Sequence, residues 1–202
     1  MSQIALPLDP GDGTPTRIVL GAGNRGVVDA LGQSQDWPFR TAVLLGPPRS
    51  GKSLLARWFE AKGHGEAIDR AQAWDETELF HRWNRAQEDG RPLLLVADDE
   101  AWDIALPDLR SRLSGSLQLA ITAPDDAMVA ELIAAHAEQR RLALAEGAAH
   151  YLVPRLTRSY AAIERLVAEI DRISLERKAP ATLSVWRDAL DAVERPEQAR
   201  LL

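Results

Sequence analysis

The sequence predicts an α/β fold in which a parallel, doubly wound sheet is followed by a small helical lid. A Gly-x-x-x-x-Gly-Lys-Ser loop at 46–53 lies between an apolar stretch and an amphipathic one, which is the order strand, phosphate loop, helix. Short apolar stretches then alternate with helical patterns, as they do in parallel sheets. The expected parts are a peptide and linker at 1–16, an α/β core at 17–123 and a helical lid at 124–202.

Hydrophobic spacing gives the expected elements in chain order. Apolar stretches of strand length alternate with stretches whose apolar residues recur at three-to-four spacing. Strands are expected at 17–20, 41–45, 66–69, 93–96 and 117–121, and core helices at 27–31, 52–62, 75–86 and 105–113. In the lid, Asp125 or Asp126 is expected to cap a first helix, with further helices at 146–153, 160–173 and 182–193.

Composition limits the classes of function. The 202 residues carry a net charge of -6 and a pI near 5.3, so no long-range positive field attracts the whole molecule to nucleic acid or to an anionic membrane. There is no cysteine, no apolar run near the about 20 residues of a membrane span and no visible leader, which indicates a cytosolic protein. The four histidines lie far apart, so no zinc site is expected.

The loop at 46–53 predicts a bound nucleotide. Glycines let backbone N–H groups face a polyphosphate, the lysine contacts the β- and γ-phosphates, and the following hydroxyl binds Mg²⁺. The predicted nucleotide-binding residues are Gly46, Pro47, Pro48, Arg49, Ser50, Gly51, Lys52 and Ser53. The helix that opens at Lys52 adds its positive end to the same site. The expected cofactors are ADP or ATP with Mg²⁺.

A carboxylate at a strand end is also needed to hold the metal ion, and two stretches compete for this role. One is 93–96, four apolar residues that are followed closely by Asp98, Asp99 and Glu100. The other is the short stretch 66–69, which ends in Asp69. Composition favours the first, and spacing alone leaves the choice open.

Two further segments suggest contacts. Residues 3–8, Gln-Ile-Ala-Leu-Pro-Leu, precede a linker rich in Pro, Gly and Asp, and they suit an extended peptide that places apolar anchors in a partner's groove. By spacing alone a frayed terminus is the better interpretation. In the lid, most arginines are expected on solvated faces, but Arg158 at the start of the third helix is placed to reach a nucleotide.

These motifs together resemble the Hda/HdaA family, short AAA+ relatives of the replication initiator DnaA, over nearly the whole chain. Residues 3–8 resemble the family's peptide for the sliding clamp, which reverses the interpretation as a frayed terminus and implies clamp contacts by Gln3, Leu6 and Leu8. The segment 18–25 resembles the turn near the adenine, with Asn24 in the nucleotide site. The segments 106–113 and 156–160 resemble those that carry the arginine finger and the second sensor, which implies these roles for Arg112 and Arg158.

The resemblance also implies a metal site at Asp69. The stretch 93–96 aligns with the first-sensor strand, where Val96 replaces a usual polar residue. Arg70 stands where many relatives carry a second, catalytic acid. The short span between the loop helix and Asp69 implies a sheet with one strand fewer than usual.

The function that the resemblance implies is regulatory. An adenine-nucleotide-binding AAA+ protein would dock on the sliding clamp, stimulate ATP hydrolysis by DnaA and limit re-initiation, with weak hydrolysis of its own. Neither a membrane nor sequence-specific DNA is an expected partner, and homo-oligomers are left open. An alternative is a nucleotide kinase or another stand-alone P-loop NTPase, although 45 residues precede Gly46 here. A third is a scaffold that has lost nucleotide binding, which a binding assay would reveal.

Overall fold

The computed structural model describes residues 3–5, 17–98 and 102–194. The chain forms two compact units, Met1–Thr122 and Ala123–Leu202. The first contains a parallel sheet with helices, and the described elements of the second are helices joined by one isolated parallel bridge, Leu144 to Ala181. Each is described by itself below.

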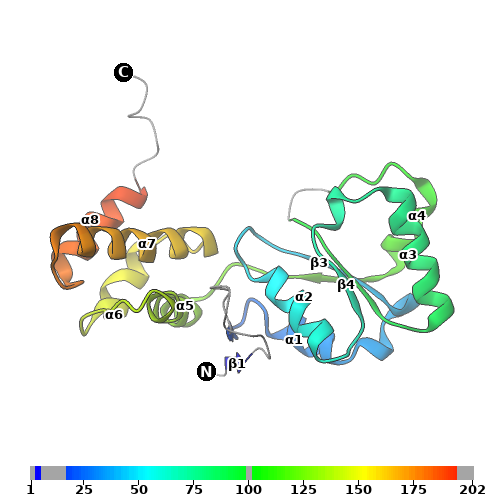
Figure 1. Cartoon of the computed structure of the whole chain (residues 1–202), viewed down its shortest axis with the longest axis horizontal. Helices are drawn as coiled ribbons and strands as arrows, with labels where there is room; N and C mark the ends of the chain where they lie inside the picture. The colour runs from blue at the N-terminus through cyan, green and yellow to red at the C-terminus, as the bar shows by residue number, and fades with distance from the viewer. Residues whose placement is uncertain (1–2, 6–16, 99–101, 195–202) are drawn as a thin grey trace, which may run out of the picture. The chain divides into compact units, whose positions relative to one another are not determined.

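The first unit is built on a four-stranded parallel sheet with the strand order β4-β5-β3-β6. The strands are β3 (Thr41–Leu45), β4 (Glu66–Ile68), β5 (Leu93–Val96) and β6 (Leu117–Ala120). The helices are α1 (Arg25–Gly32), α2 (Lys52–Ala61), α3 (Glu76–Asp89) and α4 (Pro107–Gly115). Figure 1 shows α1 and α2 on one face of the sheet and α3 and α4 on the other. The predicted α/β fold is confirmed.

The core explains why α3 and α4 lie side by side. All four residues of β5 are buried, and two alternate ones, Leu93 and Leu95, pack in the apolar cluster that α3 and α4 share. The apolar cluster on this face includes Val43, Ile68, Leu79, Trp83, Leu93, Leu95, Leu109 and Leu113. Helix α3 begins where the Asp75 carboxylate accepts the N–H groups of Thr77 and Glu78, and it ends at Gly90, whose φ is 64°. Three-to-four spacing therefore predicted both the helix and its buried side.

Strand β4 forms one edge of the sheet. Its outward N–H, that of Ala67, donates to Glu60 Oε1 on α2 at 3.1 Å. The Glu66 carboxylate accepts from Arg82 Nη1 on α3 at 2.6 Å. Both side-chain contacts tie this short strand to the helices around it.

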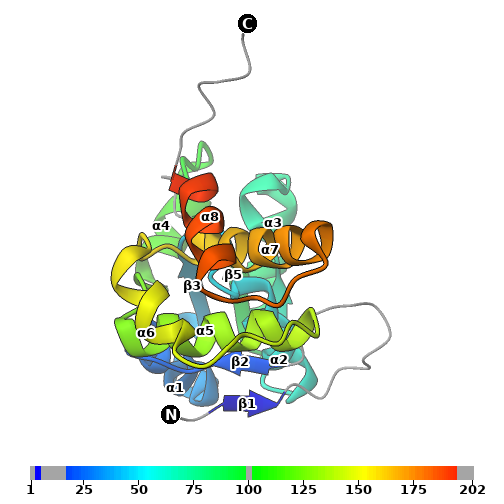
Figure 2. The ribbon, with the colours of Figure 1, turned by 90° about the vertical axis from the view of Figure 1, so that its left-hand side faces the viewer.

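A second, two-stranded sheet lies at the N-terminal side. Strand β1 (Gln3–Ala5) pairs antiparallel with β2 (Arg17–Val19), so that Gln3 is opposite Val19 (Figure 2). The sequence suggested a tethered peptide, and no spacing signal crosses the linker to indicate this pairing. Leu6 and Leu8 lie outside the described residues.

The second unit is a cluster of four helices with their own core. They are α5 (Asp126–Gln139), α6 (Ala148–Leu152), α7 (Tyr160–Arg177) and α8 (Leu183–Glu194). Asp125 caps α5 by accepting the Met128 N–H at 2.7 Å. The longest described helix, α7, buries Ile163, Leu166, Val167 and Ile170 in a cluster that also holds Ile133 of α5 and Trp186 of α8. Within the described part of the chain, no helix is both long and apolar enough to cross a membrane.

Tyr160 makes this unit sensitive to alkaline pH. Its hydroxyl donates to Met128 Sδ at 3.7 Å, and burial, assisted by the negative charge of Asp125, raises its pKa to about 12. A raised pKa means that the folded chain keeps the proton longer than the unfolded one. The stabilisation is therefore complete below about pH 10 and is lost as the pH rises towards about 12.

We expect Tyr160→Phe to flatten this alkaline dependence, because phenylalanine has no proton to lose. Thermal unfolding of both proteins between about pH 8 and pH 12 measures it. If the melting temperatures of the variant and the unaltered chain fell equally as the pH rises, Tyr160 would not be the cause of the alkaline destabilisation.

Candidate nucleotide-binding site

The phosphate loop occupies the carboxyl end of β3 and the start of α2. Lys52 is the first residue of α2 and is 8% exposed. Its Nζ donates to the carbonyl oxygens of Gly46 and Pro47, the second at 3.0 Å. The loop therefore curves around its own lysine.

Several features of this loop fit a bound polyphosphate. A Cβ on Gly46 would lie 2.9 Å from Ile121 Cβ and 3.2 Å from Ser50 Oγ, so only glycine fits there. Gly51 has a φ of 88°, which favours glycine. Ser50 Oγ is buried and has no hydrogen-bond partner among the described residues. Arg49 adopts a φ of 66°, and such strain in a non-glycine residue is concentrated at functional sites.

Three polar side chains contact one another in sequence, from Lys52 on α2 to Asp98 after β5 and then to Gln72 after β4. Asp98 Oδ1 lies 3.5 Å from Lys52 Nζ, and Asp98 Oδ2 accepts from Gln72 Nε2 at 2.7 Å. The amide oxygen of Gln72, Oε1, is buried without a partner among the described residues. Sequence reasoning did not identify Gln72, because its place depends on a 3₁₀ turn at Ala71–Ala73 that no motif signals.

Asp69 lies directly after β4 and is exposed. Its Oδ1 accepts the N–H of Arg70 at 3.0 Å, and Arg70 has a φ of 52°. Because β5 lies between β4 and β3, Asp98 is one strand away from the phosphate loop and Asp69 is two. Asp99 and Glu100 lie outside the described residues. Among the residues described, no cluster of three or more His, Cys, Asp or Glu side chains is arranged to hold a metal ion.

Asn24 shapes the turn between β2 and α1. It is 3% exposed. Its Oδ1 accepts the Gly21 N–H at 3.0 Å and its Nδ2 donates to the Val19 carbonyl at 2.8 Å. Both ends of the amide are thus bonded to the turn's own backbone, and the Thr122 N–H bonds to the same turn at Gly23.

Arg112 lies on α4 and packs against α3. Its Cζ lies 4.5 Å from the centroid of the Phe80 ring and 4.3 Å from that of the Trp83 ring. Its Nη1 donates to Asn84 Oδ1 at 2.6 Å. Arg112 is half-buried, whereas Arg110 on the same helix is exposed and donates to the carbonyl oxygen of Ile104. These contacts were not expected from the sequence, because Phe80, Trp83 and Asn84 lie on a helix distant from Arg112 in the chain.

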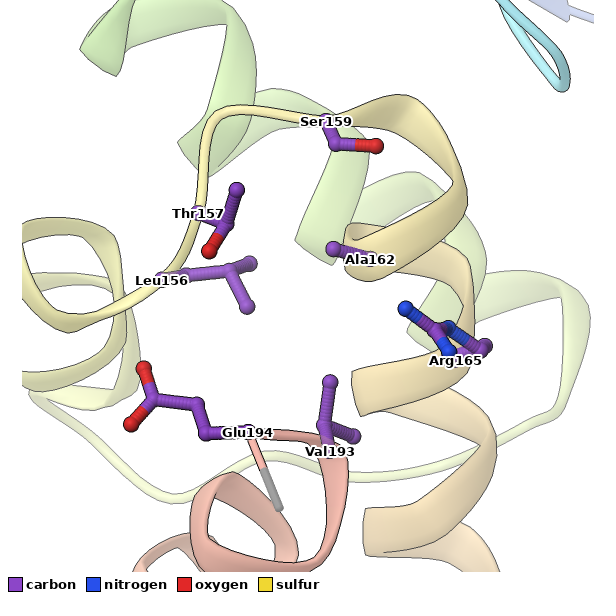
Figure 3. Close-up of a pocket in the computed structure, with 7 residues that line it drawn as sticks. All are labelled: Leu156, Thr157, Ser159, Ala162, Arg165, Val193 and Glu194. Carbon is purple, nitrogen blue, oxygen red and sulfur yellow. The ribbon is translucent and has the colours of Figure 1, made fainter. Parts of the chain in front are cut away.

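Arg158 belongs to the second unit. It forms an ion pair of 2.8 Å with Asp126, and its side chain is 62% exposed. The same loop borders a hollow of about 440 Å³, in which Arg165 and Glu194 lie on different sides (Figure 3). The hollow is lined by Leu156, Thr157, Ser159, Ala162, Arg165, Val193 and Glu194.

Comparisons with known proteins show which sequences and folds this chain resembles. No protein-family model matches the chain. It is 30% identical over 122 residues to an uncharacterized protein of Haemophilus influenzae, a match that covers 58% of this chain and about half, 53%, of that protein.

Two solved structures have a similar fold. Domain III of the replication initiation protein DnaA from Thermotoga maritima has a TM-score of 0.74 at 16% identity, covering 94% of this chain and all of that one. AMPPCP-bound DnaA from Aquifex aeolicus has a TM-score of 0.59 at 18% identity, covering 79% of this chain and 66% of that one. This chain therefore has an α/β fold with a parallel sheet and C-terminal helices, like that of DnaA domain III.

Proposed function

We propose that this chain is an adenine-nucleotide-binding regulator that activates ATP hydrolysis by the replication initiator DnaA in the cytoplasm, and so limits re-initiation. The observation that carries the proposal is Arg112, whose guanidinium is held against α3 on a core whose fold is like that of DnaA domain III. An arginine that enters a neighbour's nucleotide site stabilises charge on the transferring phosphoryl group. Arg112 would supply that charge in trans.

Binding of ADP or ATP by this chain is supported by the loop itself. Gly46 leaves room where a Cβ would clash, Ser50 offers an unpartnered hydroxyl, and Lys52 supplies a positive charge. The solved DnaA with a similar fold is bound to AMPPCP, an adenine nucleotide analogue. Ser53 would hold Mg²⁺, which neutralises phosphate charge when bound. Asn24 would act by fixing the turn that borders the adenine.

Hydrolysis by the chain itself should be slow. Arg70 replaces the second acid that the resemblance implies, and it follows Asp69 directly. A cation at this place leaves no obvious carboxylate to orient an attacking water. The expected behaviour is binding without appreciable turnover.

The metal carboxylate can be identified by comparing two variants. If Asp69 binds Mg²⁺, Asp69→Ala should weaken Mg²⁺-dependent ATP binding more than Asp98→Ala does, and chelation of Mg²⁺ should abolish the difference. Titration of a fluorescent ATP analogue with and without Mg²⁺ measures both affinities. The opposite ranking would assign the metal to Asp98, which lies beside Lys52.

Docking on the sliding clamp would use residues 3–8. Burial of Leu6 and Leu8 contributes about 1.5–3 kcal/mol each before ordering costs, so the isolated peptide should bind at roughly micromolar affinity. The variant with Gln3→Ala and Leu6→Ala should lose clamp binding while its circular dichroism spectrum stays unchanged. Unchanged retention on immobilised clamp would contradict this role.

Reconstitution tests the whole proposal. Purified DnaA bound to ATP should hydrolyse it faster when this chain and DNA-loaded clamp are both present, and omission of either should remove the effect. ATP hydrolysis measured over a single turnover reports the stimulation. No stimulation in the complete mixture would contradict the proposed function.

A further inference from the structure

One face of α3 carries the residues that contact the Arg112 guanidinium and two that hold neighbouring backbone. The contacting residues recur at spacings of three and four, which places them on one side of the helix. They are Glu76, Phe80, Trp83, Asn84 and Gln87. Glu76 and Gln87 bond to backbone groups, and the other three contact the guanidinium of Arg112. Helix α3 therefore fixes the positions of both the start of α4 and the Arg112 side chain.

The backbone contacts fix the segments beside Arg112. The Glu76 carboxylate accepts the N–H groups of Ala105 and Leu106 at 2.9 and 2.6 Å, immediately before α4 begins. At the other end of the same face, Gln87 Nε2 donates to the carbonyl of Phe39 at 2.6 Å. The entry to α4 is therefore fixed relative to α3 before any partner is present.

The contacts to Arg112 leave hydrogen-bonding capacity for an anion. Phe80 and Trp83 contact the guanidinium through their rings, at 4.5 and 4.3 Å, and stacking uses the faces of the group rather than its N–H donors. Asn84 accepts one bond, from Nη1. A guanidinium has five N–H donors, so most of them remain for a phosphate that approaches in the plane of the group.

We infer that Asn84, with the rings of Phe80 and Trp83, positions Arg112 for the nucleotide of a partner subunit. Asn84 is thus a positioning residue that does not touch the nucleotide itself. The inference rests on the proposed function, because it assigns Arg112 a target in trans. Without this support the long side chain would sample many rotamers, and the fraction of encounters with a correctly aimed guanidinium would fall.

Asn84→Ala tests the inference with two measurements. In the stimulated reaction, we expect the maximal rate at saturating concentration to fall roughly 10- to 100-fold, while the concentration for half-maximal stimulation stays nearly constant. In the isolated chain, the side-chain NMR signals of Arg112 should lose the ring-current shift that two stacked rings impose. Asn84→Asp retains an oxygen acceptor for Nη1 and should restore both.

Arg85→Ala is the matched control, because Arg85 is the next residue on α3 and is exposed. It should change neither measurement. Full stimulation by Asn84→Ala, or an Arg112 signal without a ring-current shift in the unaltered chain, would overturn the inference. If Arg112→Ala itself left stimulation unchanged while the ring-current shift was present in the unaltered chain, the proposed function would fail instead.

Discussion

Replacing Arg112 with alanine is expected to remove the stimulation of DnaA ATP hydrolysis, a loss of about 10³–10⁵-fold in rate. This corresponds to roughly 4–7 kcal/mol of barrier, far more than a surface arginine contributes to stability. Nucleotide binding and clamp binding should stay near normal, because the side-chain contacts of Arg112 within the described residues are with Phe80, Trp83 and Asn84 on α3. Single-turnover hydrolysis in the reconstituted mixture measures the effect.

Arg112→Lys is the informative companion variant. An ammonium cannot present a planar face to Phe80 and Trp83 or make a bidentate phosphate contact, so this variant should fail almost as badly as alanine. Arg85→Ala removes a charge from the neighbouring helix and should have full activity. Full stimulation by Arg112→Ala would mean that the trans-acting group lies elsewhere, or that the chain does not activate hydrolysis.

Lys52→Ala should reduce affinity for ATP by about 100-fold or more. The ammonium is the charge that the loop places at the phosphates, and charge-assisted hydrogen bonds contribute about 1.5–3 kcal/mol each. Its loss removes at least two such contacts, since a phosphate chain offers several acceptors. Equilibrium titration with a fluorescent ATP analogue gives the change in Kd.

The control for this variant lies at the other end of the same helix. Lys62 is exposed beyond the last turn of α2, so Lys62→Ala should bind ATP normally. Thermal unfolding must accompany both titrations, because Lys52 also bonds the carbonyls of Gly46 and Pro47. An unchanged Kd in a folded Lys52→Ala variant would exclude this loop as the phosphate site.

Local patterns predicted most of the fold. The strand at 41–45 has the expected bounds, and the helix after the phosphate loop begins at Lys52 as expected and ends at Ala61, one residue earlier than expected. Asp125, one of the two capping residues expected for the first lid helix, caps α5, and α3 begins one residue later than expected because Asp75 is its cap. Such signals are contained within a few neighbouring residues, where backbone preference and hydrophobic spacing act directly.

Contacts between distant residues could not be predicted in this way. Asn84 and Arg112 are 28 positions apart, and Gln72 and Asp98 are 26 apart. Each pair meets only because two strands of the sheet bring separate helices or turns together. The pairing of Gln3 with Val19 across a linker is a third example. Specific side-chain geometry of this kind follows from the assembled fold rather than from any single stretch.

The short sheet has a consequence for solubility. The sequence implied a sheet with one strand fewer than usual in the family that the chain resembles, and β4 lies at an edge of the sheet. Open strand edges expose backbone groups that recruit other chains into aggregates. Here the Ala67 N–H is already bonded to Glu60 on the neighbouring helix, and the strand is only three residues long. A foreign strand would have to displace a carboxylate to gain very few hydrogen bonds. One acidic side chain thus protects the edge that a further strand would otherwise cover.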